Sequence, residues 1–273
     1  MDFNQTLRQN NLRVEKLLEN TTNGFAKNDV NDAVKYSLLD GGKRLRPCLV
    51  FETAKLFGVD DKNIEKIAVA IEMIHTYSLV HDDLPCMDDD DFRRGKPSCH
   101  KKFGEANAVL AGDALLNLAC ETLLDGEYSQ SYFRAIKYIF DCSGICGIIG
   151  GQAVDICPDK QKDFETLDFL TENKTAKLIF ACTVATAIYC GATTEQQENL
   201  AVFAENFGKA FQVADDLLDA DIDQNLSYTN LLGVDGAKKQ LNEYTQTAID
   251  SIKRFKNADF FVELCKFNLT RNH

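Results

Sequence analysis

The sequence predicts an all-α fold: a single-domain, multi-helix bundle that takes up residues 1–273. Stretches such as IEKIAVAIEMIHTYSLV and LAVFAENFGKAFQVADDLLD are longer than typical strands and repeat apolar residues every three or four positions. Only four prolines occur, the last at position 158, so no proline interrupts the helices beyond it. Residues 64–82 and 173–190 are apolar around most of a helix circumference, which places both helices inside the bundle.

Composition disfavours several classes of protein. The 45% hydrophobic content suits a full core, and the formal net charge of −12 argues against nucleic acid or anionic membranes as partners. The N-terminal residues lack the apolar core of a signal peptide, and no run of about 18 apolar residues predicts a membrane span. The ten cysteines are dispersed and lack the paired spacing of metal ligands, which favours reduced thiols over disulfides. We therefore expect a cytoplasmic protein without stable membrane association.

An acidic run follows the expected helix 64–82, in the segment HDDLPCMDDDDFRRGKP. We expect Asp82 and Asp83 to end this helix just before Pro85. An unbroken helix would point Asp82 and Asp88 in different directions, but a break at the proline can bring the second carboxylate back toward the first. The segment DDLPCMD then suits a chelate for a metal ion.

A second acidic group lies in FQVADDLLD, where Gln212, Asp215, Asp216 and Asp219 share one stripe of a helix. A single acidic run is usually a solvated face, but two runs on otherwise buried helices are hard to explain in that way. Converging carboxylates suit a hard divalent cation such as Mg²⁺, which often completes its shell with phosphate oxygens. Diphosphate is the ligand that this pattern favours.

Three basic groups stand out against the acidic chain: GGKRLRP with Lys43, Arg44 and Arg46, FRRGKP with Arg93 and Arg94, and TENKTAK with Lys174 beside Thr175. Arginine forks bind phosphate oxygens bidentately, and lysine adds a point charge. No Walker loop or GxGxxG accompanies them, so the sequence indicates no nucleotide. Each motif alone says little, and His75 alone would be interpreted as a core histidine; the prediction depends on the combination.

The order of these motifs resembles that of the trans-isoprenyl diphosphate synthases, most of all the bacterial members that make farnesyl diphosphate. The resemblance runs from about residue 38 to 233, through GGKRLRP, HTYSLVHDDLPCMDDDDFRRGKPSCHKKFGEANAVLAGDALL, GGQAVD, NKTAKL and FQVADDLLD. The closing TRNH resembles the family's basic C-terminus. The resemblance implies a helical bundle around a deep central cavity, a homodimer, and two aspartate motifs that face each other across the cavity mouth.

The resemblance also implies roles for the motif residues. Asp82, Asp88 and Asp215 would bind three Mg²⁺ ions, with Mn²⁺ as an alternative metal. Asp83, Asp216 and Asp219 would support them, Asp219 as a further metal ligand. Arg93 and Lys174 would hold the allylic diphosphate, and Lys43, Arg46, His75 and Arg94 would hold isopentenyl diphosphate. Thr175 and Gln212 would lie near the developing carbocation.

The implied reaction is the Mg²⁺-dependent head-to-tail condensation of isopentenyl diphosphate with dimethylallyl or geranyl diphosphate. Mg²⁺, arginine and lysine would stabilise the departing diphosphate while an allylic cation forms, and the apolar cavity would exclude water. Tyr77, five residues before Asp82, together with Ser78, would limit the product to farnesyl diphosphate. Without the resemblance, Tyr77 is as readily interpreted as a core aromatic, and geranyl or geranylgeranyl diphosphate is the alternative product.

The sequence departs from the family after the second aspartate motif. The family has a longer loop with two lysines there, whereas DDLLDADIDQNLSYTNLLG has Asn225 in place of the second lysine and Thr229 in place of a proline. Segments 126–132 and 255–260 also look short beside the family. Three explanations compete: a loop is missing from the sequence as read, the diphosphate is held by fewer contacts, or efficient catalysis has been lost.

The last explanation leaves a second hypothesis, a non-catalytic subunit that regulates an active synthase. A terpene cyclase would share the acidic motifs, but it has no use for a second anionic site such as GGKRLRP with His75.

Overall fold

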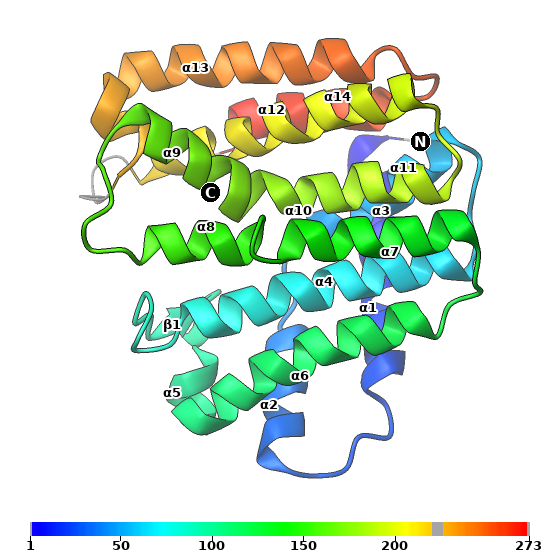
Figure 1. The fold of residues 1–273 in the computed structure, drawn as a ribbon, viewed down its shortest axis with the longest axis vertical. Helices are drawn as coiled ribbons and strands as arrows, with labels where there is room; N and C mark the ends of the chain where they lie inside the picture. Colours follow the sequence, from blue (N-terminus) through cyan, green and yellow to red (C-terminus); the bar gives the residue numbers. More distant parts are fainter. Residues whose placement is uncertain (1, 220–225, 272–273) are drawn as a thin grey trace. The chain divides into compact units, whose positions relative to one another are not determined.

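The computed structural model describes residues 2–219 and 226–271. The fold is all-α, as predicted, and among the described residues only two strands of two residues each interrupt the helices (Figure 1). The first elements are α1 (Phe3–Thr22), α2 (Asp29–Leu38), α3 (Leu45–Leu56), α4 (Lys62–Asp82), β1 (Phe92–Arg93), β2 (Lys96–Pro97), α5 (Cys99–Phe103) and α6 (Glu105–Leu124). They are followed by α7 (Gln130–Ser143), α8 (Ile148–Asp155), α9 (Phe164–Leu170), the π-helical η1 (Thr171–Ala176), α10 (Lys177–Phe180), the π-helical η2 (Ala181–Ala185), α11 (Thr186–Tyr189), α12 (Thr194–Leu218), α13 (Tyr228–Ile252) and α14 (Asp259–Thr270).

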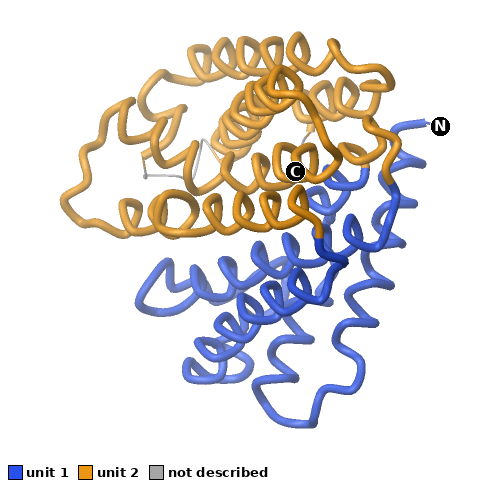
Figure 2. Tube along the Cα trace, turned by 45° about the vertical axis from the view of Figure 1, so that its right-hand side comes forward, with its two compact units in different colours: residues 1–51, 60–128 blue, residues 52–59, 129–273 orange. Residues whose placement is uncertain are grey.

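The chain divides into two compact units, coloured separately in Figure 2. The first unit comprises residues 1–51 and 60–128, and the second comprises residues 52–59 and 129–273. Because two compact units can belong to one domain, the prediction of a single domain over residues 1–273 stays a prediction.

In the first unit, α4 is the central helix. The side chain of Asp61 caps its start by accepting a hydrogen bond from the N–H of Ile64 at 3.0 Å. Residues 67–74 are all buried, two full turns that cover every face of the helix, and α4 packs against α1, α2 and α6. This confirms the prediction that the helix is apolar around its circumference and lies inside a bundle.

The helix α6 differs from the expectation that no segment is long and apolar enough to cross a membrane. By length and composition alone it qualifies, with a mean hydropathy of 1.2 over its best 18 residues, of which 33% are buried. It packs against α2, α4 and α5, as a core helix of a helical bundle does, but Val109 and Leu110 remain 41% and 51% exposed.

In the second unit, α12 is the longest helix that carries predicted site residues. A capping box between Thr193 and Gln196 starts it. Phe203 and Phe207 stack on one another with centroids 5.5 Å apart and belong to the buried core. The helical run predicted for residues 173–190 is confirmed, but it is interrupted by the π-helical segments η1 and η2.

The two strands form a hairpin that the sequence did not predict. Phe92 pairs with Pro97 and Arg93 with Lys96 in antiparallel register. The two turn residues, Arg94 and Gly95, have φ of +53° and +78°, as a type I′ turn requires. This short hairpin carries both arginines of FRRGKP.

Candidate functional site

The chain after α4 folds back onto the end of the helix, as the proline break predicts. Asp82 is the last residue of α4 and Asp83 caps it. The N–H of Asp88 donates to the carbonyl of Asp82 at 2.9 Å. Residues 82 and 88 are therefore neighbours, with Asp82 partly buried and Asp88 exposed. The first predicted pair of metal ligands is brought together within the first unit.

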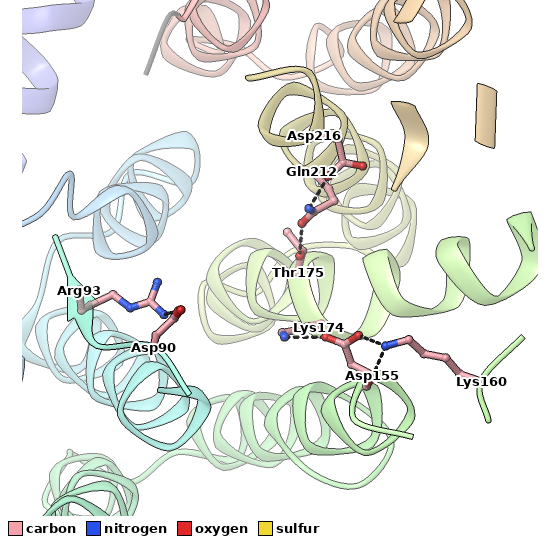
Figure 3. A network of polar contacts seen from close by, with 8 residues as sticks. All are labelled: Asp90, Arg93, Asp155, Lys160, Lys174, Thr175, Gln212 and Asp216. Carbon is pink, nitrogen blue, oxygen red and sulfur yellow. Dashed lines mark hydrogen bonds and ion pairs between the residues drawn. The ribbon is translucent and has the colours of Figure 1, made fainter. Parts of the chain in front are cut away.

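The neighbouring Asp83 has a different environment. It is buried, and its Oδ1 accepts a hydrogen bond from Nε of Arg93 at 3.0 Å. The guanidinium of Arg93 also pairs with Asp90 at 2.9 Å (Figure 3). Burial raises the pKa of Asp83 above its ordinary value, although Arg93 opposes the shift. The Asp83 carboxylate thus positions Arg93, and its expected role in supporting the metal stays a prediction.

Arg46 and His75 also meet in the first unit. Nη1 of Arg46 lies 3.2 Å from Nε2 of His75, so two of the residues expected to bind isopentenyl diphosphate are neighbours. Burial, followed by the charges of Arg46 and Arg94, holds the pKa of His75 well below its ordinary value. The imidazole is therefore neutral at pH 7 and can accept a hydrogen bond from Arg46.

The low pKa of His75 predicts a pH-dependent stability. In the unfolded chain this histidine has an ordinary pKa of 6.5, so below that pH the unfolded state binds a proton that the folded state does not. The free energy of unfolding should fall as the pH drops below about 6.5, by at most about 1.4 kcal/mol per pH unit from this group. We expect His75→Gln to flatten this dependence in urea unfolding between about pH 7.5 and pH 5. Parallel pH profiles for the two proteins would contradict the assignment.

Arg94 is seated against the glycine pair of GGKRLRP. Its Nη1 donates to the carbonyl of Gly41 at 2.6 Å. A Cβ on Gly42 would lie 2.8 Å from Cζ of Arg94, and the φ of Gly42 is +112°, so this position requires glycine. Burial, with the nearby Arg44, lowers the pKa of Arg94, but an arginine stays charged at every physiological pH.

Arg44 has a structural role, which differs from the role expected for its neighbours Lys43 and Arg46. Its buried guanidinium bonds Glu15 and Glu72, each at 2.7 Å, and donates to the carbonyl of Leu38 at 2.7 Å. Lys43 is exposed and Arg46 is partly buried. Arg44 therefore fixes the loop that carries the other two cations, a role that the sequence did not reveal because its partners lie far away in the chain.

The first unit contains a pocket that joins several of these groups. Its lining includes Leu79 and Asp83 from the end of α4 and Arg93 and Arg94 from the hairpin. Of the predicted diphosphate ligands, this pocket brings Arg93 and Arg94 together. Lys43, Arg46 and His75 are not among its lining residues.

In the second unit, Lys174 and Thr175 lie on η1, a π-helical turn of the kind often found at functional sites. Nζ of Lys174 is 2.8 Å from Oδ2 of Asp155, and Lys160 is 2.8 Å from Oδ1 of the same carboxylate (Figure 3). Burial would raise the pKa of Asp155, but the two lysines outweigh it and the pKa is lowered. The sequence did not identify Asp155, the last residue of GGQAVD, as the partner of Lys174.

A chain of hydrogen bonds leads from Thr175 to the start of α13. The hydroxyl of Thr175 donates to Oε1 of Gln212 at 3.1 Å, and Nε2 of Gln212 donates to Oδ1 of Asp216 at 2.9 Å (Figure 3). Oδ2 of the buried Asp216 accepts from the N–H of Tyr228 at 2.7 Å. Thr175 and Gln212 are thus brought together as predicted, while Asp216 orients Gln212 and anchors α13.

Two glycines allow neighbouring helices to approach η1 closely. A Cβ on Gly151 of α8 would lie 2.8 Å from the backbone N of Lys174. A Cβ on Gly208 of α12 would lie 2.6 Å from Cβ of Ala176 and 2.7 Å from its Cα. The positions of Lys174 and Thr175 therefore depend on both glycines.

Gly208→Ala should push α12 away from η1 and separate Thr175 from Gln212. Overpacking of this kind costs about 1–3 kcal/mol of stability, and a shift of reacting groups by about 1 Å can cost about 100-fold in rate. We expect the loss of kcat to exceed the loss of stability, measured by steady-state kinetics and urea unfolding. Adding Ala176→Gly, which removes one of the two contacts, should restore part of the rate; no loss in the single variant would contradict the close approach.

Asp215 is paired with a residue of the closing TRNH. A guanidinium nitrogen of Arg271 bonds Oδ1 of Asp215 and donates to the carbonyl of Phe211 at 3.2 Å, and the guanidinium lies 4.1 Å from the centre of the Phe211 ring. Burial raises the pKa of Asp215 although Arg271 opposes the shift. Asp219 caps α12 and is exposed.

Of the departures from the family, Asn225 lies outside the described residues. Thr229 is buried near the start of α13, with its hydroxyl 3.1 Å from that of Ser227.

Tyr77 and Ser78 lie on α4 above the acidic end. The Tyr77 ring is 5% exposed, and its hydroxyl has no hydrogen-bond partner among the described residues. Burial raises its pKa to about 12. The hydroxyl of Ser78 donates to the carbonyl of His75 at 2.9 Å. This environment suits a core aromatic, and the role of both residues in chain length stays a prediction.

The donor groups fit the metal that the sequence predicts. Asp83 and Asp216 are engaged by Arg93 and by Tyr228 and Gln212. The predicted ligands Asp82, Asp88, Asp215 and Asp219 supply only carboxylate oxygens, which are the ligands that Mg²⁺ prefers, and Asp215 is also paired with Arg271.

Comparison with known proteins identifies the family. The Polyprenyl synthetase family model matches residues 27–239. The chain is 38% identical over 284 aligned positions to the farnesyl diphosphate synthase of Bacillus subtilis, covering 95% of this chain and 96% of that protein. It is 40% identical to a chloroplastic geranylgeranyl pyrophosphate synthase of Catharanthus roseus, covering 89% of this chain and 73% of that protein. The crystal structure of an FPP/GFPP synthase from Zymomonas mobilis matches with a TM-score of 0.92 at 35% identity, covering 97% of this chain and 98% of that chain.

An all-α protein with this set of carboxylates, arginines and lysines is a prenyltransferase. The chain belongs to the polyprenyl synthetase family, which confirms the resemblance seen in the sequence.

Proposed function

We propose that this protein condenses isopentenyl diphosphate with dimethylallyl or geranyl diphosphate to give farnesyl diphosphate and diphosphate. The observation that carries the proposal is the meeting of residues 82 and 88 beside the Asp83–Arg93 ion pair, in a chain similar along nearly its whole length to farnesyl diphosphate synthases. Geranylgeranyl diphosphate is the alternative product, because synthases of that product are also among the relatives.

We assign the metal to four carboxylates. Asp82, Asp88, Asp215 and Asp219 would hold three Mg²⁺ ions, or Mn²⁺ in their place. A bound metal would neutralise the diphosphate and make it a competent leaving group. Arg271 bonds Oδ1 of Asp215, so an ion would bind the other carboxylate oxygen or displace the arginine.

The cationic side chains divide between the two substrates. Arg93 and Lys174 bind the allylic diphosphate and stabilise the negative charge that grows on it as the C–O bond breaks. Lys43, Arg46, His75 and Arg94 hold isopentenyl diphosphate, whose double bond attacks the allylic cation.

Thr175 and Gln212 are assigned to the stabilisation of the allylic cation. Their oxygens, already joined by a hydrogen bond, would stabilise the positive charge of the cation. The proton lost after carbon–carbon bond formation passes to the departed diphosphate, so no protein base is needed for this step.

Product analysis tests this function. Purified protein incubated with Mg²⁺, isopentenyl diphosphate and geranyl diphosphate should release farnesyl diphosphate, and EDTA should abolish the product. If both substrates bind but no product forms, the activity should be measured again after mixing with an active synthase. A change in the partner's rate or product length would favour the regulatory subunit, which the missing lysines of the loop after Asp219 suggest.

Tyr77 provides a test of product length. If its ring limits the growing chain, Tyr77→Ala should shift the main product from fifteen carbons to longer chains. The variant should also lose about 3–5 kcal/mol of stability, because a buried aromatic side chain is removed. Tyr77→Phe should keep both the product and the stability, since the hydroxyl has no partner among the described residues. The product is identified by chromatography against standards. If Tyr77→Ala made the same product as the unaltered protein, the ring would be a core aromatic without a role in chain length.

We also propose a cytoplasmic homodimer without stable membrane association. The exposed apolar residues Val109 and Leu110 of α6 support a second copy as the covering surface. Sedimentation of the purified protein measures its oligomeric state, and sedimentation with lipid vesicles measures its membrane association.

A further inference from the structure

Asp89, Asp91 and His100 form a cluster of side chains of the kinds that bind metals. The cluster follows Asp82 and Asp88 in the chain, and the proposed reaction gives none of its three residues a role. A ring nitrogen of His100 and one carboxylate oxygen each of Asp89 and Asp91 all lie within 4.8 Å of one another. In the described part of the chain no other three histidine, cysteine or acidic side chains come so close. Ligand atoms that share one ion at 2.0–2.2 Å stand up to about 4.4 Å apart, so small side-chain shifts would close this cluster around a metal.

One ring nitrogen of the buried His100 lacks a hydrogen bond among the described residues. Its side chain is 95% buried, being only 5% exposed, and Nδ1 lies 3.0 Å from the hydroxyl of Ser98. Nε2 is buried and has no hydrogen-bond partner within residues 2–219 and 226–271. A buried nitrogen without a partner costs free energy and calls for an explanation. When Nδ1–H donates to Ser98, Nε2 presents its lone pair, which is the arrangement of a metal-bound histidine.

The two carboxylates are exposed, and the backbone fixes their positions. The N–H of Asp89 donates to the carbonyl of Leu84 at 3.1 Å, and the carbonyl of Asp91 accepts from the N–H of Ser98 at 2.9 Å. Asp91 also pairs with Lys101 at 2.6 Å, but both side chains are well exposed. An exposed ion pair of this kind contributes little, so a divalent ion can displace the lysine.

We propose that Asp89, Asp91 and His100 bind a divalent transition-metal ion, at a site distinct from the carboxylates of the diphosphate site. One imidazole and two carboxylates suit Zn²⁺, Co²⁺ or Mn²⁺, whereas Mg²⁺ prefers oxygen ligands alone. Water would complete the shell on the exposed side. The ion would tie residues 89 and 91 to residue 100, across the hairpin of residues 92–97 that carries Arg93 and Arg94. It would thereby restrict the motion of two arginines of the pocket.

The test is Co²⁺ binding to the full-length, chelator-stripped protein without substrate. Visible absorption reports the coordination geometry of bound Co²⁺, and calorimetry with Co²⁺ gives the stoichiometry and affinity. We expect one tight site, with affinity lowered at least about 10-fold in His100→Gln and in Asp91→Asn. Asp90→Asn, which removes the acidic residue between the two ligands, should leave the site intact, and so should Asp82→Asn.

Several results would overturn the proposal. They are the absence of stoichiometric binding by the unaltered protein, equal affinity in Asp91→Asn, or a site that disappears with Asp82→Asn alone. Because Asp91 is exposed, its variant tests the proposal even if the buried His100 variant does not fold.

Discussion

Replacing Asp82 by asparagine should lower kcat about 1000-fold and raise the Mg²⁺ concentration needed for half-maximal rate. The substitution keeps the size of the side chain but removes a carboxylate where the backbone brings residue 88 back to residue 82. Because the metal supplies several kcal/mol of charge stabilisation in the transition state, losing a ligand costs about 4 kcal/mol, which corresponds to that rate.

Asp83→Asn is the matched control, since it changes the adjacent carboxylate of the same motif. Asp83 is buried and positions Arg93, so its variant should weaken binding of the allylic diphosphate and reduce stability without changing the Mg²⁺ dependence. Steady-state rates measured across Mg²⁺ and substrate concentrations separate the two effects. If both variants responded to Mg²⁺ alike, the division of labour between Asp82 and Asp83 would be wrong.

In both acidic motifs the two adjacent aspartates have different environments, and the sequence could not reveal this difference. In each Asp-Asp pair the second residue is buried and holds other groups: Asp83 holds Arg93, and Asp216 holds Gln212 and the N–H of Tyr228. Successive residues of a helix point about 100° apart, so two adjacent aspartates cannot share one environment. Which of them faces the interior depends on the packing of neighbouring helices.

The helices and the break after α4 could be predicted because their causes are local. Apolar periodicity marks residues 64–82, and Pro85 cannot continue the helix. The hairpin turn could not be predicted in the same way, because it places Arg94, a residue that rarely adopts positive φ, at its first position. The seat for its side chain comes from Gly41 and Gly42, far away in the sequence.

The π-helical turn η1 was also beyond sequence reasoning. A π-turn adds one residue to a helical turn without changing composition or polarity, so residues 173–190 look like an ordinary helix. Its close neighbours Gly151 and Gly208 come from other helices. The ion pair between Lys174 and Asp155, which are 19 residues apart, depends on the same packing.

Lys174→Met should lower kcat/KM for the allylic diphosphate by about 30- to 1000-fold, with a smaller effect on isopentenyl diphosphate. Removing one charged contact to a developing anion costs about 2–4 kcal/mol in the transition state. Lys174 is well placed to make such a contact because Asp155 holds its ammonium group only partly buried, at 29% exposure. The methionine keeps the aliphatic part of the side chain, so the packing of η1 should survive.

Lys160→Met distinguishes this role from a structural one. Lys160 bonds the same carboxylate at the same distance of 2.8 Å and is similarly exposed, at 22%. Either substitution leaves Asp155 with one lysine, so both should reduce the free energy of unfolding by comparable amounts. Only Lys174→Met should impair catalysis if that ammonium group reaches the substrate, because Lys160 is not one of the residues to which we assign diphosphate binding. Equal kinetic losses in the two variants would mean that Asp155, held by both lysines, matters for the shape of the second unit and that the allylic diphosphate is held by other groups.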